Sequence, residues 1–181
     1  MISHRSEVRE AILDAAGELV HSAGPIAVTM SRIAEVVGIG RATLYKYFPD
    51  VEHVLSAWHE RQISAHLSEL ASLGNHASNP ADRLRAVLSG YARICADRGR
   101  HGEWGAALHR GEAMVTAQQR LHDLMTGLVS EAAATGTVRA DMPASLLASY
   151  CLHALTAASD TGAGTDAALV DVVWAGLACR A

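Results

Sequence analysis

The sequence predicts an all-α protein of about nine helices, in which a three-helix head is joined by a long fourth helix to a helical bundle. Three observations indicate this class. Apolar residues recur at helical spacing along nearly every segment. Short stretches rich in glycine, proline and asparagine separate those segments. Nowhere do apolar and polar residues alternate as they do along a half-buried strand.

Length and charge limit the classes of protein that fit. The chain has 181 residues, of which 50% are hydrophobic, so one or two small domains can each bury a core. No apolar run reaches the ~18 residues of a membrane span, and the polar N-terminus lacks the apolar region of a signal peptide. We therefore expect a cytoplasmic protein without contact to a membrane. The net charge of −4 excludes a globally basic nucleic-acid coat protein, so any contact with DNA must use local positive charge.

The first helix is predicted over residues 6–22, where Val8, Ile12 and Leu19 share one face. The tripeptide Ala-Gly-Pro that follows is a strong helix stop. This helix is expected to cover the two short helices that come next.

Residues 29–48 predict two short helices with a tight turn between them. Gly38 tolerates the left-handed backbone that such a turn needs, and the small Ala34 lets the second helix cross close over the first. Apolar residues at helix-turn-helix spacing are expected to face inward: Ile33, Val37, Ile39, Leu44 and Tyr47. Residues able to donate hydrogen bonds are left pointing outward: Arg41, Thr43, Tyr45 and Lys46. This is the composition of a helix that enters a DNA major groove.

A long fourth helix is predicted over residues 51–73. Pro49 ends the preceding helix, and Asp50 is a good N-cap for the next one. A helix of this length spans about 30 Å, enough to begin in the head and end in a second domain. Further helices are predicted over residues 80–97, 104–114, 116–135, 142–159 and 166–179.

The segment from Ile12 to Leu55 resembles the TetR family of transcriptional regulators. The resemblance is strongest in residues 28–48, VTMSRIAEVVGIGRATLYKYF, and in the Pro49-Asp50 pair that comes directly after them. Beyond the N-terminal part, the chain is similar to the family only in helix number, order and length. The resemblance implies a DNA-binding domain over residues 6–66, with its recognition motif at 29–48, and an effector-binding and dimerisation domain over residues 67–181.

The resemblance also implies which residues contact DNA. They are Thr29 on a phosphate, Arg41, Thr43 and Tyr45 in the groove, and Lys46 and Tyr47 against the backbone or its near edge. Chemistry agrees, because an arginine can bind a guanine edge with two hydrogen bonds whereas a lysine is a point charge for a phosphate. Two positions depart from many relatives: Gly40 replaces a serine and Val51 replaces a phosphate-binding lysine. We therefore expect somewhat weaker non-specific binding than in relatives with that lysine.

A ligand cavity among the helices of the second domain is a further implication of the resemblance. Flexible and aromatic walls with few polar groups suit an apolar or aromatic effector. The candidate wall residues are Trp58, Tyr91, Cys95, Trp104, Leu108, Leu121, Met125, Leu128, Tyr150 and His153. Ordinary core packing is the alternative interpretation for each of them.

The helices predicted at 142–159 and 166–179 have more apolar surface than one bundle needs. This predicts a homodimer through a four-helix interface formed by two such pairs. The expected interface residues are Leu147, Ala154, Ala158, Val170, Val173, Trp174 and Leu177. The alternative is that these faces cover the protein's own core.

Histidines and cysteines leave a sensing role open but do not favour it. His59 and His66 lie two turns apart on one helix, too far for one metal ion without a third element. The other histidines considered are His101, His109 and His122. The three cysteines, Cys95, Cys151 and Cys179, are too far apart for a close-spaced zinc motif, and their odd number argues against a disulfide framework. We expect buried thiols, with a redox sensor as the alternative, and no bound metal.

The residues and the resemblance together predict a dimeric transcriptional regulator. It is expected to be a repressor that leaves a pseudo-palindromic DNA operator when a small effector binds. No pair of carboxylates, nucleophile–base set or metal-ligand cluster supports catalysis, so we expect neither an enzyme nor a cofactor. The alternatives are an all-α ligand-binding protein or enzyme without a DNA role, and a non-specific architectural DNA protein, which the net charge of −4 disfavours.

Overall fold

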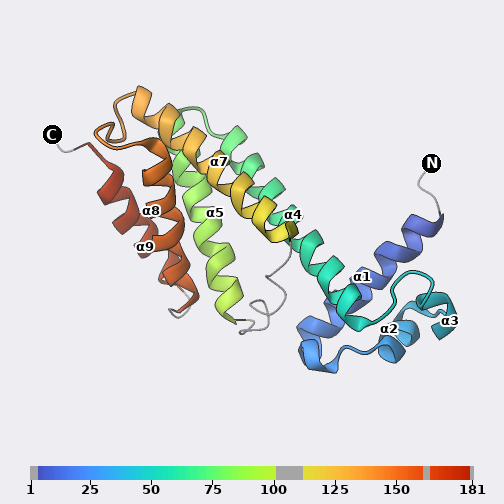
Figure 1. Ribbon diagram of the computed structural model, residues 1–181. Helices are drawn as coiled ribbons and strands as arrows, with labels where there is room; N and C mark the ends of the chain where they lie inside the picture. Colours follow the sequence, from blue (N-terminus) through green and yellow to red (C-terminus); the bar gives the residue numbers. More distant parts are fainter. Residues whose placement is uncertain (1–3, 101–111, 161–163, 180–181) are drawn as a thin grey trace. The chain divides into compact units, whose positions relative to one another are not determined.

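The computed structural model describes residues 4–100, 112–160 and 164–179, and these residues are almost entirely helical (Figure 1). The elements are α1 (His4–Ala23), η1 (Pro25–Ala27), α2 (Met30–Val37), α3 (Arg41–Leu44), α4 (Val51–His76), α5 (Pro80–Arg100), α7 (Glu112–Ala134), α8 (Ala144–Thr156), η2 (Ala157–Ser159) and α9 (Asp166–Leu177). Within the described ranges the only strand-like pairing is an isolated antiparallel bridge between Val138 and Ala178. The predicted all-α class is confirmed.

Several helix ends differ from the sequence prediction. The stretch that begins at Gly74 was expected to be a break, but α4 continues through it to His76. A Cβ at Gly74 would lie 3.4 Å from Val87 Cγ2 and 3.8 Å from Leu128 Cδ2, which are ordinary van der Waals contacts, so the packing around this buried position has room for a Cβ. Most of the helix predicted at residues 104–114 lies outside the described residues, and α7 begins at Glu112 rather than at residue 116.

The chain divides into two compact units, and the division falls inside α4, after Ile63. In the first unit, α2 lies beside α1 and α3 lies beside α2 (Figure 1). Its core is made by residues from α1, α2, α3 and the beginning of α4, with Ile12, Ile33, Leu44 and Val54 fully buried. This arrangement fixes the short α3 against a rigid support.

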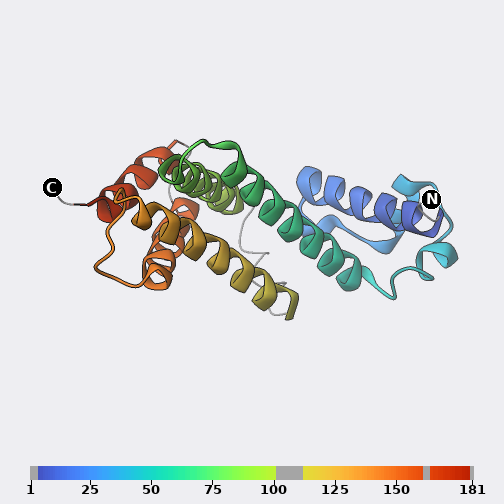
Figure 2. The ribbon, with the colours of Figure 1, turned by 90° about the horizontal axis from the view of Figure 1, so that it is seen from above.

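The second unit is a bundle in which α5 contacts α7, α8, η2 and α9 (Figures 1 and 2). Its buried residues include Leu84 and Leu88 of α5, Met125 of α7 and Leu155 of α8. Arg83 of α5 contacts both α4 and α7. Its Nε donates a hydrogen bond to the Gly74 carbonyl of α4 at 2.6 Å, and its guanidinium pairs with Glu131 of α7 at 2.8 Å. The last turns of α4 are therefore fixed to α5 and α7.

Candidate nucleic-acid interface

The turn between α2 and α3 has the geometry that a helix-turn-helix needs. Thr29 is the N-cap of α2, and its hydroxyl accepts a hydrogen bond from the Arg32 backbone N–H at 3.3 Å. At the other end of α2, Gly38 is left-handed, with φ 72° and ψ 30°. Its N–H donates to Glu35, and the Ile39 N–H donates to Ala34 at 3.0 Å. A glycine is required there because side chains disfavour this backbone region.

The apolar residues of this segment hold α3 on the head. Ile33 and Leu44 are fully buried and Ala34 is nearly so. Val37, Ile39 and Tyr47 are half-buried and pack against the same core. The predicted inward face is therefore confirmed, and Tyr47 offers only part of its surface to a partner.

The residues that the sequence singled out lie on α3 and in the turns that follow it. Arg41 and Lys46 are exposed, Tyr45 is 54% exposed, and Thr43 is half-buried. α3 itself is only one turn, Arg41–Leu44, whereas a helix to Phe48 was expected. The chain continues in tight turns in which the N–H groups of Lys46 and Tyr47 donate to carbonyls three residues back. Phe48 then inserts its ring into the head core ahead of Pro49.

Arg41 lies close to the start of α2, because its guanidinium donates a hydrogen bond to the Ser31 hydroxyl. This hydrogen bond brings the first turn of α2 and the start of α3 together. Arg32, also in the first turn of α2, makes a different contact: its guanidinium donates a hydrogen bond to the Ala27 carbonyl at 3.2 Å.

The two positions that depart from many relatives have clear structural roles. Gly40 is the N-cap of α3 and supplies no side-chain hydrogen bond. Val51, at the start of α4, is half-buried against the head core, so packing occupies the position where relatives have a lysine. Asp50 caps α4, as predicted: its carboxylate accepts from the His53 N–H at 2.9 Å and lies 2.8 Å from His53 Nδ1. These hydrogen bonds lower the pKa of Asp50, and the charged carboxylate opposes a phosphate at this helix start.

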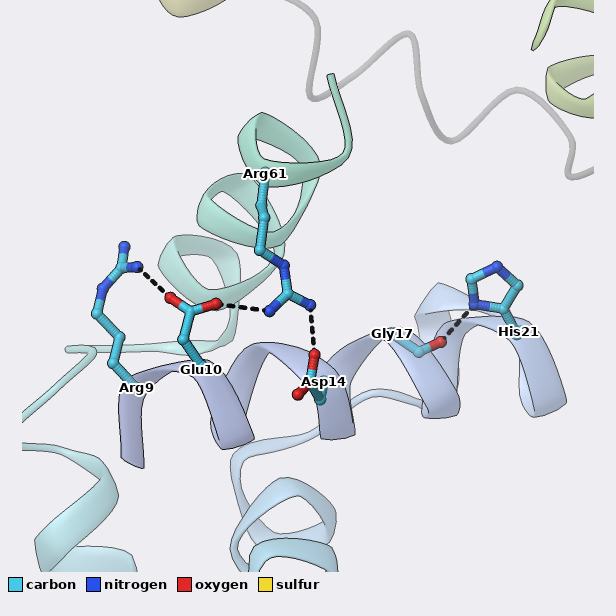
Figure 3. Close-up of polar contacts among 6 residues, drawn as sticks. All are labelled: Arg9, Glu10, Asp14, Gly17, His21 and Arg61. Carbon is cyan, nitrogen blue, oxygen red and sulfur yellow. Dashed lines mark hydrogen bonds and ion pairs between the residues drawn. The ribbon is translucent and has the colours of Figure 1, made fainter. Parts of the chain in front are cut away.

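A network of charged side chains joins α1 to α4 in the first unit, and the sequence did not reveal it (Figure 3). Arg61 of α4 donates to Glu10 and to Asp14 of α1, at 2.8 Å in each case. Burial lowers the pKa of Arg61, but these two hydrogen bonds and the nearby charges outweigh it and raise the pKa overall. Arg9 pairs with Glu10 at 3.6 Å and lies over the Phe48 ring, 5.3 Å from its centroid.

The predicted ligand-cavity residues that the structure describes belong to both units. Trp58 belongs to the first unit, where its indole packs beside Gly17 and makes an edge contact with His21. In the second unit, Tyr91, Cys95, Met125 and Leu128 are buried in one core cluster, with Leu121 packed against it. Tyr150 and His153 are exposed, and the His153 Nδ1 lies 2.7 Å from the Ser149 carbonyl. Trp104 and Leu108 lie outside the described residues.

The predicted dimer-interface residues turn out to pack inside the protomer. Val173 and Leu177 are fully buried, and three further residues are nearly so: Leu147, Ala158 and Val170. Ala154 and Trp174 are half-buried against the same core. Helical periodicity identified the apolar stripe correctly but assigned it to a partner chain, although the stripe covers the protein's own core. The exposed apolar residues of these helices are Leu146 at 56%, Tyr150 at 44% and Val172 at 64%.

The other candidate sensing residues that the structure describes differ in burial and in their hydrogen bonds. Cys95 and Cys151 are buried, whereas Cys179 is exposed. His122 Nε2 lies 3.1 Å from both the Ser145 carbonyl and the Ser149 hydroxyl, so it links α7 to α8. His101 and His109 lie outside the described residues. Among the residues that the structure does describe, no three histidine, cysteine or acidic side chains are grouped as metal ligands, and no helix is long and apolar enough to cross a bilayer.

Comparisons with known proteins agree with this geometry. The family described as bacterial regulatory proteins, tetR family, matches residues 12–57. An uncharacterized HTH-type transcriptional regulator of Mycobacterium tuberculosis is 31% identical over 93 residues, which make up 51% of this chain and 46% of that protein. The HTH-type transcriptional repressor KstR of Rhodococcus jostii is 32% identical over 91 residues, covering 49% of this chain and 41% of the repressor. The chain thus spans about half the length of the curated relatives it matches, and these are transcriptional regulators rather than enzymes.

Similarity of fold extends over nearly the whole chain. A TetR/AcrR-family regulator from Thermobifida fusca superposes with a TM-score of 0.77 at 20% identity, over 93% of this chain and 95% of the other. At that identity the superposition shows the fold alone. The family match lies in the head, whose α2–turn–α3 geometry and outward polar residues are described above. Residues 12–57 are thus the part of the chain that is similar to the tetR family of bacterial regulatory proteins.

Proposed function

We propose that the protein is a dimeric, sequence-specific DNA-binding transcriptional regulator that represses its target genes until a small effector releases it. The observation that supports this most is the outward face of α3. Arg41 on α3, and Tyr45 and Lys46 in the turns directly after it, are exposed, while the Gly38 turn and the buried Leu44 anchor this segment on the head. A preorganised polar helix face is what insertion into a major groove requires.

The proposed contacts divide into two kinds. Arg41 would bind a guanine edge with two hydrogen bonds, with Thr43 and Tyr45 contacting neighbouring bases. Lys46, the Thr29 hydroxyl and the exposed part of Tyr47 would bind phosphates and fix the register. Because the whole chain has a net charge of −4, binding depends on these few local groups rather than on a general attraction.

We propose that the homodimer uses the exposed side of α8 and α9. Leu146, Tyr150 and Val172 lie there, and large apolar side chains exposed together on neighbouring helices favour burial against a second copy. Two copies would present two heads to successive major grooves, about 34–36 Å apart on one side of a pseudo-palindromic operator.

Effector binding is proposed for the second unit, in the neighbourhood of Tyr91, Cys95, Met125 and Leu128. These buried side chains are apolar or weakly polar, which suits a small apolar or aromatic effector. Such a molecule can release the operator only if it binds one arrangement of the protein better than another. We propose that α4 connects effector binding to the DNA-binding head. It is one continuous helix from Val51 to His76, so it belongs to both units.

A selection from random-sequence duplex DNA tests the proposal. The full-length protein is expected to enrich one pseudo-palindromic sequence and to shift it in a gel at moderate salt, with a scrambled duplex left unbound. Failure to enrich any sequence would contradict the DNA-reading role and would favour a ligand-binding protein without a DNA role. Equal binding to all sequences would favour the architectural alternative.

A further inference from the structure

In the first unit, α4 meets α1 through two neighbouring side chains, Trp58 and Arg61. Their partners on α1 are Glu10, Asp14, Gly17 and His21, which follow one another at three- and four-residue steps and so share one face of that helix. We call these two contacts together the α1–α4 joint. The two side chains and their four partners all lie outside the recognition segment, residues 29–48.

The first contact of the joint is a notch at Gly17. A Cβ built there would lie 2.7 Å from Trp58 Nε1 and 3.4 Å from its Cδ1, closer than a real side chain permits. The missing Cβ therefore lets the indole lie directly against the backbone of α1. One turn further along α1, the His21 ring meets the indole edge-on, with centroids 6.2 Å apart and planes at 87°.

The second contact is the guanidinium of Arg61, held between two carboxylates (Figure 3). One of its terminal nitrogens donates to Glu10 and the other to Asp14, both at 2.8 Å. A planar group that binds two acceptors one turn apart fixes the rotation of α4 about its axis as well as its distance from α1. Glu10 also pairs with Arg9, which lies over the ring of Phe48, so the network continues to the end of the recognition segment.

We propose that Trp58 and Arg61 are positioning residues that set the angle at which α4 leaves the head, and that this angle determines the spacing at which a dimer presents its two recognition helices to DNA. The inference rests on the proposed function, because it concerns a dimeric DNA reader. It concerns residues that do not touch DNA and act through the orientation of α4.

A loosened joint has a specific consequence for binding. When one head is bound, the second head searches for its half-site at an effective concentration that depends on how well the protein holds the two at the right distance. A wider range of α4 angles lowers that concentration. Binding to a single half-site needs one intact head only, so it is insensitive to the joint.

Long-range electrostatics offers a simpler explanation for an effect of Arg61, since any cation in the head attracts DNA. Removing its partners separates the two explanations. In Glu10→Ala/Asp14→Ala, the joint loses both acceptors while the head loses two negative charges. Electrostatics alone predicts tighter binding to every DNA, whereas a joint predicts weaker binding to the two-site operator.

Two matched controls are available. Glu7→Ala/Glu18→Ala removes the same charge from exposed positions of the same helix but leaves both partners of Arg61 in place. Gly127→Ala is the control for Gly17→Ala: it places the same methyl group inside a helix where no other side chain lies within 4 Å. Thermal melting of every variant shows whether it folds, and because Glu10 and Asp14 are exposed their double variant is tolerant of the change.

The experiment measures the affinity of the full chain for the selected operator and for a duplex with one half-site, at low salt where half-site binding is measurable. Gly17→Ala and Glu10→Ala/Asp14→Ala are expected to lose roughly tenfold or more in operator affinity and nothing on the half-site. Both controls are expected to bind at least as well as wild type. An equal loss on both DNAs, or no loss on the operator, would overturn the joint. If the wild-type chain itself selects no DNA sequence, the proposed function fails instead.

Discussion

The Arg41 guanidinium of α3 donates a hydrogen bond to the Ser31 hydroxyl of α2. A hydroxyl is a neutral partner, and an arginine leaves it at lower cost than it would leave a carboxylate. The side chain is therefore held in place in the free head and is available to a base edge when DNA arrives. Thr29, the cap of α2, lies two residues from Ser31 and belongs to the same first turn.

Arg41→Ala is expected to relax the base preference of the head. Losing a two-hydrogen-bond contact to guanine removes about 1–3 kcal/mol of discrimination at one position of each half-site. Competition binding with operators substituted at every position measures this. A uniform loss of affinity at all positions would show that Arg41 binds a phosphate instead.

Lys46→Ala is expected to weaken binding to every duplex alike. A lysine that neutralises one phosphate contributes about one unit to the slope of log affinity against log salt, so the slope should fall by about that amount. Titrations at several salt concentrations measure the slope. A changed base preference in this variant would contradict the division of roles between Lys46 and Arg41.

Gly40→Ser is expected to strengthen binding to all DNA. Gly40 caps α3 with φ −67° and ψ 145°, which any residue adopts, and a Cβ there would meet only Thr43 Oγ1, at 4.0 Å. A serine hydroxyl can cap the first turn, for a few tenths of a kcal/mol, or donate to a phosphate. Gly38→Ser is the contrasting variant: at φ 72° it should cost about 1–2 kcal/mol of stability. Melting and affinity measurements on the pair check both expectations, and weaker binding by Gly40→Ser would refute the first.

The sequence was sufficient for two features that depend on local chemistry. Gly38 was predicted at a left-handed turn and Asp50 at a helix start, because both roles depend on neighbours within a few residues. It was insufficient for contacts across the fold. The pairing of Arg61 with Glu10 and Asp14 joins residues far apart in the chain, and so does the packing of Trp58 on Gly17. Such contacts depend on how α1 and α4 cross, which the spacing of residues along each helix does not give.

The dimer prediction shows a second limit. An apolar stripe at helical spacing identifies the buried side of a helix, but the spacing is the same whether the neighbour is another helix of the chain or a second copy. Val173 and Leu177 are fully buried in the protomer, so the stripe belongs to its own core. The face left for a partner contains fewer apolar residues.

Val172→Asp is expected to yield a monomer at micromolar concentration. Val172 is 64% exposed in the protomer, so the charge harms the protomer little, but burying it in a symmetric interface places two carboxylates close together. Size-exclusion chromatography with light scattering measures the mass. Val115→Asp, at a position 67% exposed on α7, is the matched control and should remain a dimer. An unchanged mass for both variants would place the interface elsewhere.

Alkaline pH is expected to destabilise the protein through Cys151. Burial raises the pKa of this thiol from 9.0 to about 12, so the folded state keeps a proton that the unfolded state releases. The contribution of this thiol to the free energy of unfolding is complete below pH 9. It is lost as the pH rises toward 12, at up to about 1.4 kcal/mol per pH unit. Denaturant unfolding across this range should show a shallower pH dependence for Cys151→Ala than for wild type. The exposed Cys179 gives the control, because Cys179→Ala should retain the wild-type slope; equal slopes for all three proteins would refute the role of Cys151.

The ratio of two affinities tests sequence reading most directly. The wild-type chain is titrated, at a salt concentration of about 0.15 M, with the selected operator and with a scrambled duplex of the same length and composition. A head that reads base edges through Arg41, Thr43 and Tyr45 should prefer the operator by a factor of at least about 10³. A ratio near one would contradict sequence-specific recognition by this protein.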